Sequence, residues 1–582
     1  MGAALLLGVA VHAAPVHLVD EKPVEITKDA SGVYIVDFGK VAFGNVRLLP
    51  PDGARGEVIV HFGEDFVEGR VNRTPEGTVR YNKTTVALRG KAPVVAAPPP
   101  DERNTSQVSV IRANPAAILT PPEWGVVLPF RWLEVEGWSG ELLPEQIVRQ
   151  AAFASTWDDD AAMFECSDEM LNRIWEFCRY SIKATTFAGL YVDGDRERIP
   201  YEADAYLNQL SHYTTDTDIQ MARDTYDHLM INGTWPTEWG PHMIFMAHAD
   251  WMHTGDADWL APRYEALKGK LLLKRIGPDG LIVSDKGQIN KYDIVDWPPM
   301  ERDAYVMTPV NTVVNAFHLR SLELMAGLAE AVGRENDALL FRAMWKTTLG
   351  TFNEKLLDPK TGLYIDGIGT DHSAMHANFF PLAFGLVPDG ARDGIVQWLA
   401  GKGMGCSVYG AQYFLDALFE NGADAAALEL IAAEGDRSWR HMVESGATIS
   451  WEAWDLKYKP NQDWNHAWGA APANLLPRHV LGVQPFEPGW NTVRIRPMCG
   501  NLSEATGKVP TPRGPVWVTW ECAKKFRIGI AVPDGVRARL ELPAVEGSTG
   551  VFQRKDPVKA TKVGDRWILD EPVTGRIALE VR

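Results

Sequence analysis

Two acidic segments, far apart in the chain, carry the residue types best suited to chemistry. Residues 193–204 hold five carboxylates in twelve positions, with an arginine on each side of Glu197. Residues 446–455 place Glu452 between two tryptophans and end on an aspartate. Two carboxyl groups that meet in space can serve as proton donor and proton acceptor when their surroundings hold them in different protonation states. We therefore predict that the two segments form one site.

Carboxylate pairs set among aromatic residues are typical of enzymes that cleave glycosidic bonds. One carboxyl protonates the leaving oxygen, and the other activates water or attacks the sugar. The chain holds 21 Trp, 21 Phe and 15 Tyr, and the flat face and single N–H donor of tryptophan suit a sugar ring. The sequence contains no P-loop, G-x-G-x-x-G, H-E-x-x-H or G-x-S-x-G segment. The nucleotide-binding, zinc-protease and serine-hydrolase functions that these motifs indicate are therefore not predicted.

The charge composition limits which classes of partner the protein is expected to bind. The 582 residues carry 58 Lys and Arg against 76 Asp and Glu, a formal net charge of −18. Such a polyanion repels nucleic acid and anionic membranes, so neither is expected as a partner. His372 and His376 have the spacing to share a metal, but no third ligand is near in the sequence, and neither a metal nor a cofactor is expected. The five scattered cysteines form no C-x-x-C motif.

The first 14 residues are apolar and end in small residues, as a secretory signal peptide does. They lack the usual positive charges, and a buried N-terminal strand is the alternative. We expect a secreted or periplasmic protein. No other stretch approaches the roughly 18 apolar residues of a membrane span, and the oligomeric state is left open.

The hydrophobic pattern predicts a β, then α, then β order of domains. Alternating apolar runs predict strands at 33–38, 56–62, 126–136, 492–496, 516–520, 526–532, 538–542 and 576–581. Between them, helical spacing begins at 168–181 after a candidate N-cap at Ser167, and 317–331 and 338–352 form a helix pair with Gly333 as the stop. Several such pairs predict a helical toroid. The predicted boundaries are 1–14 (signal peptide), 15–160 (N-terminal β-sandwich), 161–485 (helical catalytic domain) and 486–582 (C-terminal β-sandwich).

An ordered set of motifs resembles glycoside hydrolase family 78, the α-L-rhamnosidases and their relatives. The acidic loop matches at Asp193, at the Arg-Glu-Arg core around Glu197 and at Asp204; residues 446–455 match G-A-T-T-x-W-E-x-W-D; and an Asn-His pair at 465–466 leads to the V-L-G-x-x-P junction at 480–485. The match covers nearly the whole chain. It implies a multidomain α+β fold in which an (α/α)6 barrel lies between antiparallel β-sandwich domains.

The resemblance also implies roles for individual residues. Glu197 would be the general acid and Glu452 the base of an inverting reaction on a terminal sugar, with Glu444 as the rival base. Arg196 and Arg198 are expected to pair with Asp193, Asp195 or Glu202 rather than with Glu197. The predicted substrate contacts are Asp193, Arg198, Asp204, Trp297, Trp451 and His466, and Trp235, Trp239 and Trp251 are further candidates for the cleft wall.

One departure from the family pattern bears on specificity. Where relatives carry a tryptophan and a glycine before the last aspartate of the acidic loop, this chain has Tyr201, Glu202 and Ala203. Because this segment shapes the sugar pocket, the sugar and its linkage stay open. Two other function classes also stay open: a polysaccharide lyase, which would give an unsaturated product, and a carbohydrate-binding relative without activity.

Overall fold

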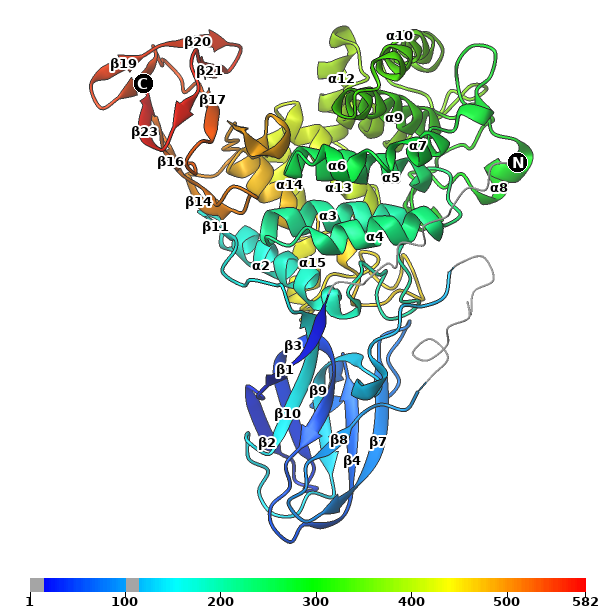
Figure 1. Ribbon diagram of the computed structural model, residues 1–582, viewed down its shortest axis with the longest axis vertical. Helices are drawn as coiled ribbons and strands as arrows, with labels where there is room; N and C mark the ends of the chain where they lie inside the picture. Colours follow the sequence, from blue (N-terminus) through cyan, green and yellow to red (C-terminus); the bar gives the residue numbers. More distant parts are fainter. Residues whose placement is uncertain (1–14, 101–114) are drawn as a thin grey trace.

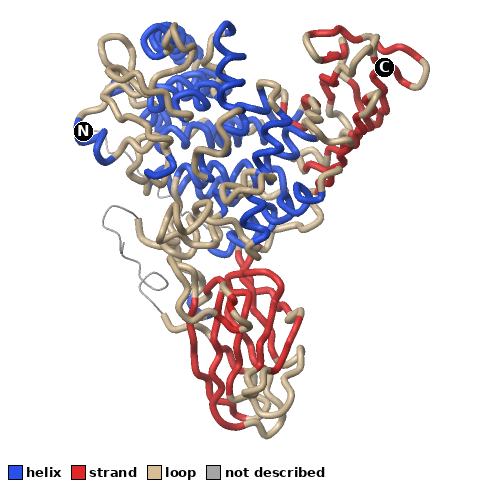
Figure 2. The backbone as a smooth tube through the Cα atoms, turned by 180° about the vertical axis from the view of Figure 1, so that it is seen from behind, coloured by secondary structure: helices blue, strands red, loops and turns tan. Residues whose placement is uncertain are grey.

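A computed structural model of the protein describes residues 15–100 and 115–582. A helical region lies at the centre, with one β domain below it and another at its upper side (Figures 1 and 2). This arrangement confirms the predicted α+β fold, with a helical domain between two β-rich domains. The C-terminal domain is not wholly antiparallel as predicted, because residues 492–495 pair in parallel with residues 537–540. The predicted signal peptide at 1–14 lies outside the described residues. Within the described residues, no helix combines the length and apolar character needed to cross a bilayer.

The N-terminal domain holds an eight-stranded antiparallel sheet and a separate two-stranded sheet, β5-β6. The order of the larger sheet is β1-β10-β3-β9-β4-β7, with β2 and β8 also paired to β3. A register shift between Asp37 and Ala42 lets the long β3 strand change partners along its length. The strands are β1 (Val16–Glu21), β2 (Glu25–Lys28), β3 (Tyr34–Leu48), β4 (Arg55–Gly63), β5 (Phe66–Val67), β6 (Arg70–Val71), β7 (Tyr81–Arg89), β8 (Val94–Ala96), β9 (Leu128–Glu136) and β10 (Ile147–Ala154).

The helical domain is a double layer. The inner helices contact one another in the order α3, α5, α9, α11, α13 and α16, and α16 returns to α3, so that they close a ring. Helices α4, α10, α12 and α14 pack outside it. The helices are α2 (Glu169–Ala184), α3 (Glu202–Thr215), α4 (Gln220–Ile231), α5 (Trp239–Thr254), α6 (Ala257–Leu260), α7 (Tyr264–Leu267), α8 (Lys286–Lys291), α9 (Thr312–Ala331), α10 (Glu335–Leu356), α11 (His376–Ala383), α12 (Asp389–Ala400), α13 (Val408–Glu420), α14 (Asp424–Ile431), α15 (Trp439–Glu444) and α16 (Pro472–Leu475).

Aromatic side chains fill the interior of this ring. Phe317 on α9 contacts Phe245 on α5, Phe380 and Phe384 from the α11 region, and Tyr413 on α13, with ring centroids 5.0–6.0 Å apart. Each such ring buries a large apolar area. The centre of the ring is therefore a packed core, and a site can form only where the connecting loops meet at one end.

The start of α2 shows how local chemistry overrides a plausible N-cap. Asp168, not Ser167, is the N-cap, and its carboxylate accepts hydrogen bonds from the backbone N–H groups of Met170 and Leu171. Ser167 instead accepts a hydrogen bond from the backbone N–H of Ser503. An aspartate caps at least as well as a serine, and Ser167 is thus left to join the helical domain to the C-terminal domain. The predicted helix pair is confirmed by α9 and α10, with Gly333 at φ 70° between them.

The C-terminal domain has two sheets. One has the order β11-β14-β15-β16-β23-β18-β19, and the other β12-β13-β17-β21-β20 with β22 beside β17. The strand β11 comes from the chain just before α2, so this sheet also anchors the start of the helical domain. The strands are β11 (Met163–Cys166), β12 (Val483–Pro485), β13 (Thr492–Ile495), β14 (Glu504–Val509), β15 (Val516–Cys522), β16 (Phe526–Ala531), β17 (Arg537–Pro543), β18 (Val551–Gln553), β19 (Asp556–Val558), β20 (Ala560–Val563), β21 (Arg566–Leu569), β22 (Val573–Thr574) and β23 (Arg576–Val581).

Candidate active site

The loops before the inner helices meet around a cavity of about 220 Å³. The acidic loop leads into α3, a tryptophan-containing loop leads into α5, and the segment carrying Glu452 leads toward α16. The positive end of a helix dipole favours carboxylates near helix N-termini. The lining residues are Asp193, Arg196, Glu197, Tyr201, Asp204, Trp235, Trp239, Ile294, Trp297, Glu452, His466 and Trp468.

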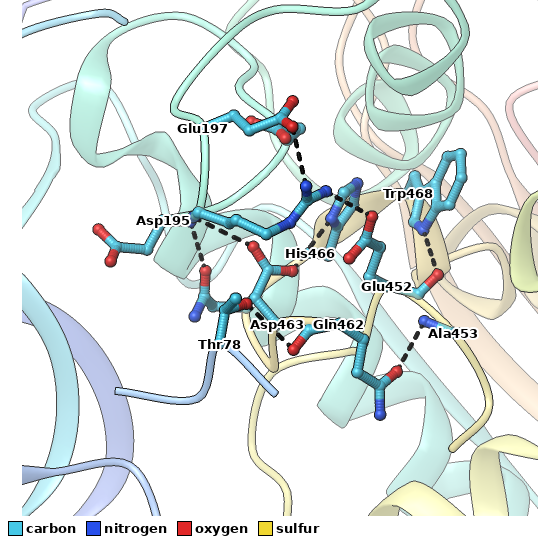
Figure 3. A network of polar contacts seen from close by, with 12 residues as sticks. Thr78, Asp195, Glu197, Glu452, Ala453, Gln462, Asp463, His466 and Trp468 are labelled. Atoms are coloured by element: carbon cyan, nitrogen blue, oxygen red, sulfur yellow. Dashed lines mark hydrogen bonds and ion pairs between the residues drawn. The ribbon is translucent and has the colours of Figure 1, made fainter. Parts of the chain in front are cut away.

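A single guanidinium group joins the two carboxylates assigned as acid and base. Arg196 donates from Nη1 to Glu197 Oε1 at 2.8 Å and from Nη2 to Glu452 Oε1 at 2.7 Å. Figure 3 shows Glu197 and Glu452 at the two ends of this chain of contacts. The prediction that Arg196 would avoid Glu197 is wrong. The two segments, distant in sequence, do meet in one site.

Arg198 has a structural position, which corrects its assignment as a substrate contact. Its side chain is buried and donates to Asp195 Oδ1 and to the backbone carbonyl of Val127. It also packs against the ring of Phe187. With its donors turned away from the cavity, Arg198 holds the acidic loop in place, and its pairing with Asp195 is one of the predicted alternatives.

Three carboxylate oxygens of the cavity lining lack a hydrogen-bond partner among the described residues. They are Asp193 Oδ2, Asp204 Oδ2 and Glu452 Oε2, and the indole N–H of Trp239 shares this property. All four side chains are buried. An unsatisfied buried polar atom costs about 1–3 kcal/mol, so a ligand that supplies hydroxyl groups would be stabilised here.

His466 lies between two aspartates. Its Nε2 is 2.7 Å from Asp204 Oδ1, and its Nδ1 is 3.2 Å from Asp463 Oδ1. Burial alone would lower the pKa of His466, but these two carboxylates outweigh it and raise that pKa well above 6.5. Because both ring nitrogens are engaged, a sugar hydroxyl would meet the open oxygen of Asp204 rather than the imidazole predicted to bind it.

Burial sets the proton affinities of the other carboxyl groups in the cavity. It raises the pKa of Glu452, against the opposing charge of Arg196, and it raises the pKa of Asp204. Burial, followed by the charge of Glu197, also raises the pKa of Asp193 well above its usual value. Glu452 is further held by Lys459 Nζ at 3.0 Å from Oε1. These shifts are of the kind found in acid–base sites.

Four tryptophans form the apolar wall of the cavity, namely Trp235, Trp239, Trp297 and Trp468. The rings of Trp235 and Trp297 meet edge to face with centroids 6.2 Å apart. Trp451, predicted as a substrate contact, is not among the lining residues; its ring is buried in a stack on Trp464. This corrects its assignment: it supports the Glu452 segment from behind. Trp251 also lies outside the lining.

Several other acidic and histidine side chains are engaged elsewhere. Glu444 pairs with Arg440 on the exposed side of α15, and it does not line the cavity. Asp296 is fully buried and contacts the backbone N–H of Trp297 and Nε2 of His376. His372 contacts Asp366 instead, so the two histidines do not converge on one ion.

The sequence reasoning missed four residues as members of the site. The sequence indicates Arg196 only as a possible partner of nearby acids, and Tyr201 only as a departure from the family pattern. Tyr201 donates its hydroxyl hydrogen to Glu197 Oε2 at 2.5 Å. Asp463 accepts from the backbone N–H of Arg196, and the indole of Trp468 donates to the carbonyl of Glu452. The nearby Asn-His pair was the signal that could have pointed to Asp463.

Glu452, Asp463 and His466 bring three potential ligand atoms within 4.8 Å of one another. A cation there would compete with the charges already present, because Glu452 contacts both Arg196 and Lys459. His466 is also held by its two aspartates. The arrangement fits a network of ion pairs better than a metal site.

The N-terminal domain supports the site from outside. Arg80, just before β7, pairs with Asp195. Figure 3 shows the contact of Thr78 with the carbonyl of Gln462. Glu64, at the end of β4, accepts from the side-chain amide of Asn465 at 2.9 Å. Burial raises the pKa of Glu64 to about 8. The acidic loop and the Asn-His segment are thus both tied to the β domain.

Two family models of bacterial alpha-L-rhamnosidase domains match this chain. Residues 159–480 match the model of the bacterial alpha-L-rhamnosidase six-hairpin glycosidase domain, and residues 482–555 match the C-terminal domain of bacterial alpha-L-rhamnosidases. An alpha-L-rhamnosidase of Streptomyces avermitilis is 22% identical over 93% of this chain and 52% of its own length. One of Formosa agariphila is 22% identical over 71% of this chain and 47% of its own.

Solved structures show the same fold. An alpha-L-rhamnosidase from Dictyoglumus thermophilum has a TM-score of 0.80 at 19% identity, over 98% of this chain and 64% of that one. The Streptomyces avermitilis enzyme complexed with L-rhamnose has a TM-score of 0.77 at 19% identity, over 98% of this chain and 54% of that one. The chain spans about half, or less, of the length of the curated relatives it matches. With more than half of its residues in the six-hairpin domain, the chain belongs to the bacterial α-L-rhamnosidase family of six-hairpin glycosidases.

Proposed function

We propose that the protein is an exo-acting, inverting α-L-rhamnosidase that removes a terminal rhamnosyl residue, or a related deoxy or uronic sugar, from a plant or algal glycan. The main support is the convergence of unpartnered carboxylate oxygens from Asp193, Asp204 and Glu452 on one cavity walled by tryptophans. Membership of this family, and the similarity of the chain to two alpha-L-rhamnosidases, support rhamnose as the sugar. The small volume of the cavity favours one terminal sugar over a long chain.

In this proposal Glu197 protonates the glycosidic oxygen and Glu452 activates the water. Arg196 lies between the two carboxylates, and a gap that holds a guanidinium group can also hold a water molecule. Inversion requires such a gap, with carboxyl groups about 6.5–9.5 Å apart. The proton that Glu197 transfers must lie on an oxygen that now accepts a hydrogen bond from Arg196 or Tyr201.

The sugar would be held by groups already oriented in the cavity. Asp193 and Asp204 each present one open oxygen to hydroxyl groups, and hydrogen bonds to carboxylates are about twice as strong as neutral ones. Trp297 offers a face to the ring. Residues 201–203 differ from the family pattern, and of these three only Tyr201 lines the cavity. Glu202 instead accepts a hydrogen bond from the backbone N–H of Thr234. The change in specificity would thus act through Tyr201, and turnover of simple aryl rhamnosides should be slow.

The test measures hydrolysis of an aryl α-L-rhamnoside and of a natural rhamnosyl disaccharide, with proton NMR of the first sugar released. The β anomer should form first. Glu197→Gln should lower the rate by about 10²–10⁴-fold, most for the disaccharide, whose leaving group needs the proton. Glu452→Gln should stop both substrates alike. The matched control is Glu444→Gln, which should keep wild-type rates.

Three results would overturn the proposal. They are an α anomer formed first, a Glu452→Gln variant with near wild-type turnover, and an unsaturated product absorbing in the ultraviolet, as a lyase would give. Binding of rhamnose without turnover of any rhamnoside would point to an inactive relative.

We also propose that the protein is secreted or periplasmic, on the basis of the apolar first 14 residues. Mass spectrometry of the native protein should find a mature start near Pro15. An intact Met1 in the cytosolic fraction would contradict export.

A further inference from the structure

A hollow larger than the candidate active site lies on the C-terminal domain. It has a volume of about 660 Å³ and lies on the outer face of the sheet that contains β14, β15, β16 and β23, with the turn between β18 and β19 at one end. In Figure 1 this domain projects from the helical domain, far from the N-terminal domain. None of the residues assigned to the active site lines the hollow.

The floor is built from small residues in register. Thr506, Thr519, Gly529 and Ala578 lie directly opposite one another across four neighbouring strands. Residues opposite one another in a sheet share a face, and strands lie about 4.8 Å apart. The row therefore spans about 14 Å, a length suited to an oligosaccharide. A Cβ added at Gly529 would lie 3.2 Å from a methyl of Thr519. The Thr519 side chain therefore leaves little room for a side chain at position 529.

A second row supplies an aromatic platform and positive charge. It reads Lys508, Trp517, Ala531 and Arg576, again directly opposite one another. Trp517 is 42% exposed, although tryptophan has much to gain from burial. The Lys508 ammonium lies 5.7 Å from the centroid of the indole ring. At the far wall Arg554 joins Arg576.

The two arginines give the hollow an uncompensated charge. Among the described residues, neither Arg554 nor Arg576 has an ion pair or a side-chain hydrogen bond. The neighbouring row of the same face reads Glu504, Glu521, Arg527 and Glu580. Glu521 and Glu580 are paired with Arg527, and Glu504, on β14, is three strands away from Arg576 on β23. A protein of net charge −18 thus presents two unpaired guanidinium groups beside an exposed indole. Guanidinium binds carboxylates in a bidentate manner.

We infer that this hollow is a second carbohydrate site, which binds a chain of uronic acid units. Trp517 stacks on a sugar face, the Thr-Gly-Ala floor admits the chain close to the sheet, and Arg554 and Arg576 bind its carboxylates. The site would hold an acidic glycan near the enzyme without taking part in the chemistry. The charge of the hollow favours an acidic glycan over a neutral one, because a hydrogen bond from a guanidinium group to a carboxylate is about twice as strong as one between neutral groups and is often bidentate.

The test uses the full-length protein and a tetramer of α-1,4-linked galacturonic acid, with its methyl ester as the neutral counterpart. Calorimetry should detect binding of the acid, weakened by added salt, and the ester should bind at least about tenfold more weakly. Saturating L-rhamnose, which under the proposed function occupies the catalytic cavity, should leave binding unchanged. Trp517→Ala should weaken binding at least about tenfold, as should the double variant Arg554→Gln/Arg576→Gln.

The matched control is Trp398→Ala. Trp398 is a half-buried tryptophan of α12 that also has a lysine over its ring, with Lys402 Nζ 4.5 Å from the centroid. This variant should bind the tetramer like wild type, and all variants should hydrolyse an aryl rhamnoside at the wild-type rate. Undetectable binding at millimolar tetramer, equal binding of acid and ester, or unchanged binding in both the Trp517 and the double arginine variants would overturn the inference.

Discussion

At the residue scale, Arg196 controls the charge of the proposed base. Burial is the main cause that raises the pKa of Glu452, and Arg196 is the largest influence in the opposite direction. A base works only when ionised, so turnover should fall as the pH drops through a pKa above the ordinary 4.5. Arg196→Gln removes the opposing charge and should shift this acid limb of kcat to higher pH. Lys459→Gln should shift it the same way but less. A limb that stays in place in both variants would contradict this.

Tyr201 is the second residue whose role can be isolated. Its hydroxyl donates to Glu197 Oε2, while its ring packs edge to face against Trp239 with centroids 5.3 Å apart. Tyr201→Phe removes the donor and keeps the ring. As Glu197 gives up its proton it becomes a carboxylate, and a hydrogen bond to a charged group contributes about 1.5–3 kcal/mol. The loss of this bond should therefore lower kcat by roughly 10–100-fold with little change in KM. The loss should be greater for a poor leaving group than for an aryl rhamnoside. A change in KM alone would mean that Tyr201 serves binding instead.

At the scale of the element, the acidic loop must fit closely against the segment that follows Glu452. Gly194 lies at the contact, with φ 109°, and a Cβ there would come within 2.8 Å of Asp463 Oδ2 and 2.9 Å of the Asn465 carbonyl. The loop is also held there by hydrogen bonds from the backbone N–H groups of Asp195 and Arg196. A larger residue would therefore push the loop, and Glu197 with it, away from Glu452.

Gly194→Ala should accordingly lower kcat/KM by at least about 100-fold, since small misplacements of catalytic groups have costs of that order. Gly446→Ala is the control, because Gly446 also has a positive φ, at 84°, but no atom within 4 Å of its added Cβ. That variant should lose about 1–2 kcal/mol of stability from backbone strain and keep its activity. Equal losses of activity in the two variants would show that strain, not the collision, is the cause.

At the scale of the whole molecule, the N-terminal β domain holds the site in place. Arg80 of that domain forms an ion pair with Asp195, which also pairs with Arg198. All three side chains are largely buried. Removing one partner of a buried ion pair lowers the free energy of unfolding by about 3–5 kcal/mol. Arg80→Met should lower both the melting temperature and kcat/KM, because Asp195 lies in the acidic loop.

The control for this variant is Arg73→Met. Arg73 pairs with Glu134 and Glu136 inside the N-terminal domain. Its loss should lower the melting temperature only slightly and leave kcat/KM unchanged. Should Arg80→Met retain full activity, the β domain would be a neighbour of the site rather than part of its support.

Much of the fold follows from local sequence patterns. The alternation at 516–520 and 526–532 corresponds to β15 and β16, and the apolar spacing on either side of Gly333 corresponds to α9 and α10. These predictions succeed because periodicity reports which face of an element is buried. The order of domains and the acidic segments were likewise visible in the sequence, and the predicted roles of Glu197 and Glu452 remain predictions until activity is measured.

Only the tertiary structure decided how the side chains of the site are divided between chemistry and support. Arg196 and Arg198 are two positions apart and identical in type, yet one joins Glu197 to Glu452 and the other is buried against Asp195. Trp451 precedes Glu452 in the chain but stacks on Trp464, away from the cavity. Motifs specify residue types and spacing. The direction of a side chain in a loop depends instead on the partners that the tertiary structure brings close, because loops have no periodicity that fixes which side faces inward. Such partners can be as distant in sequence as Glu452 is from Arg196.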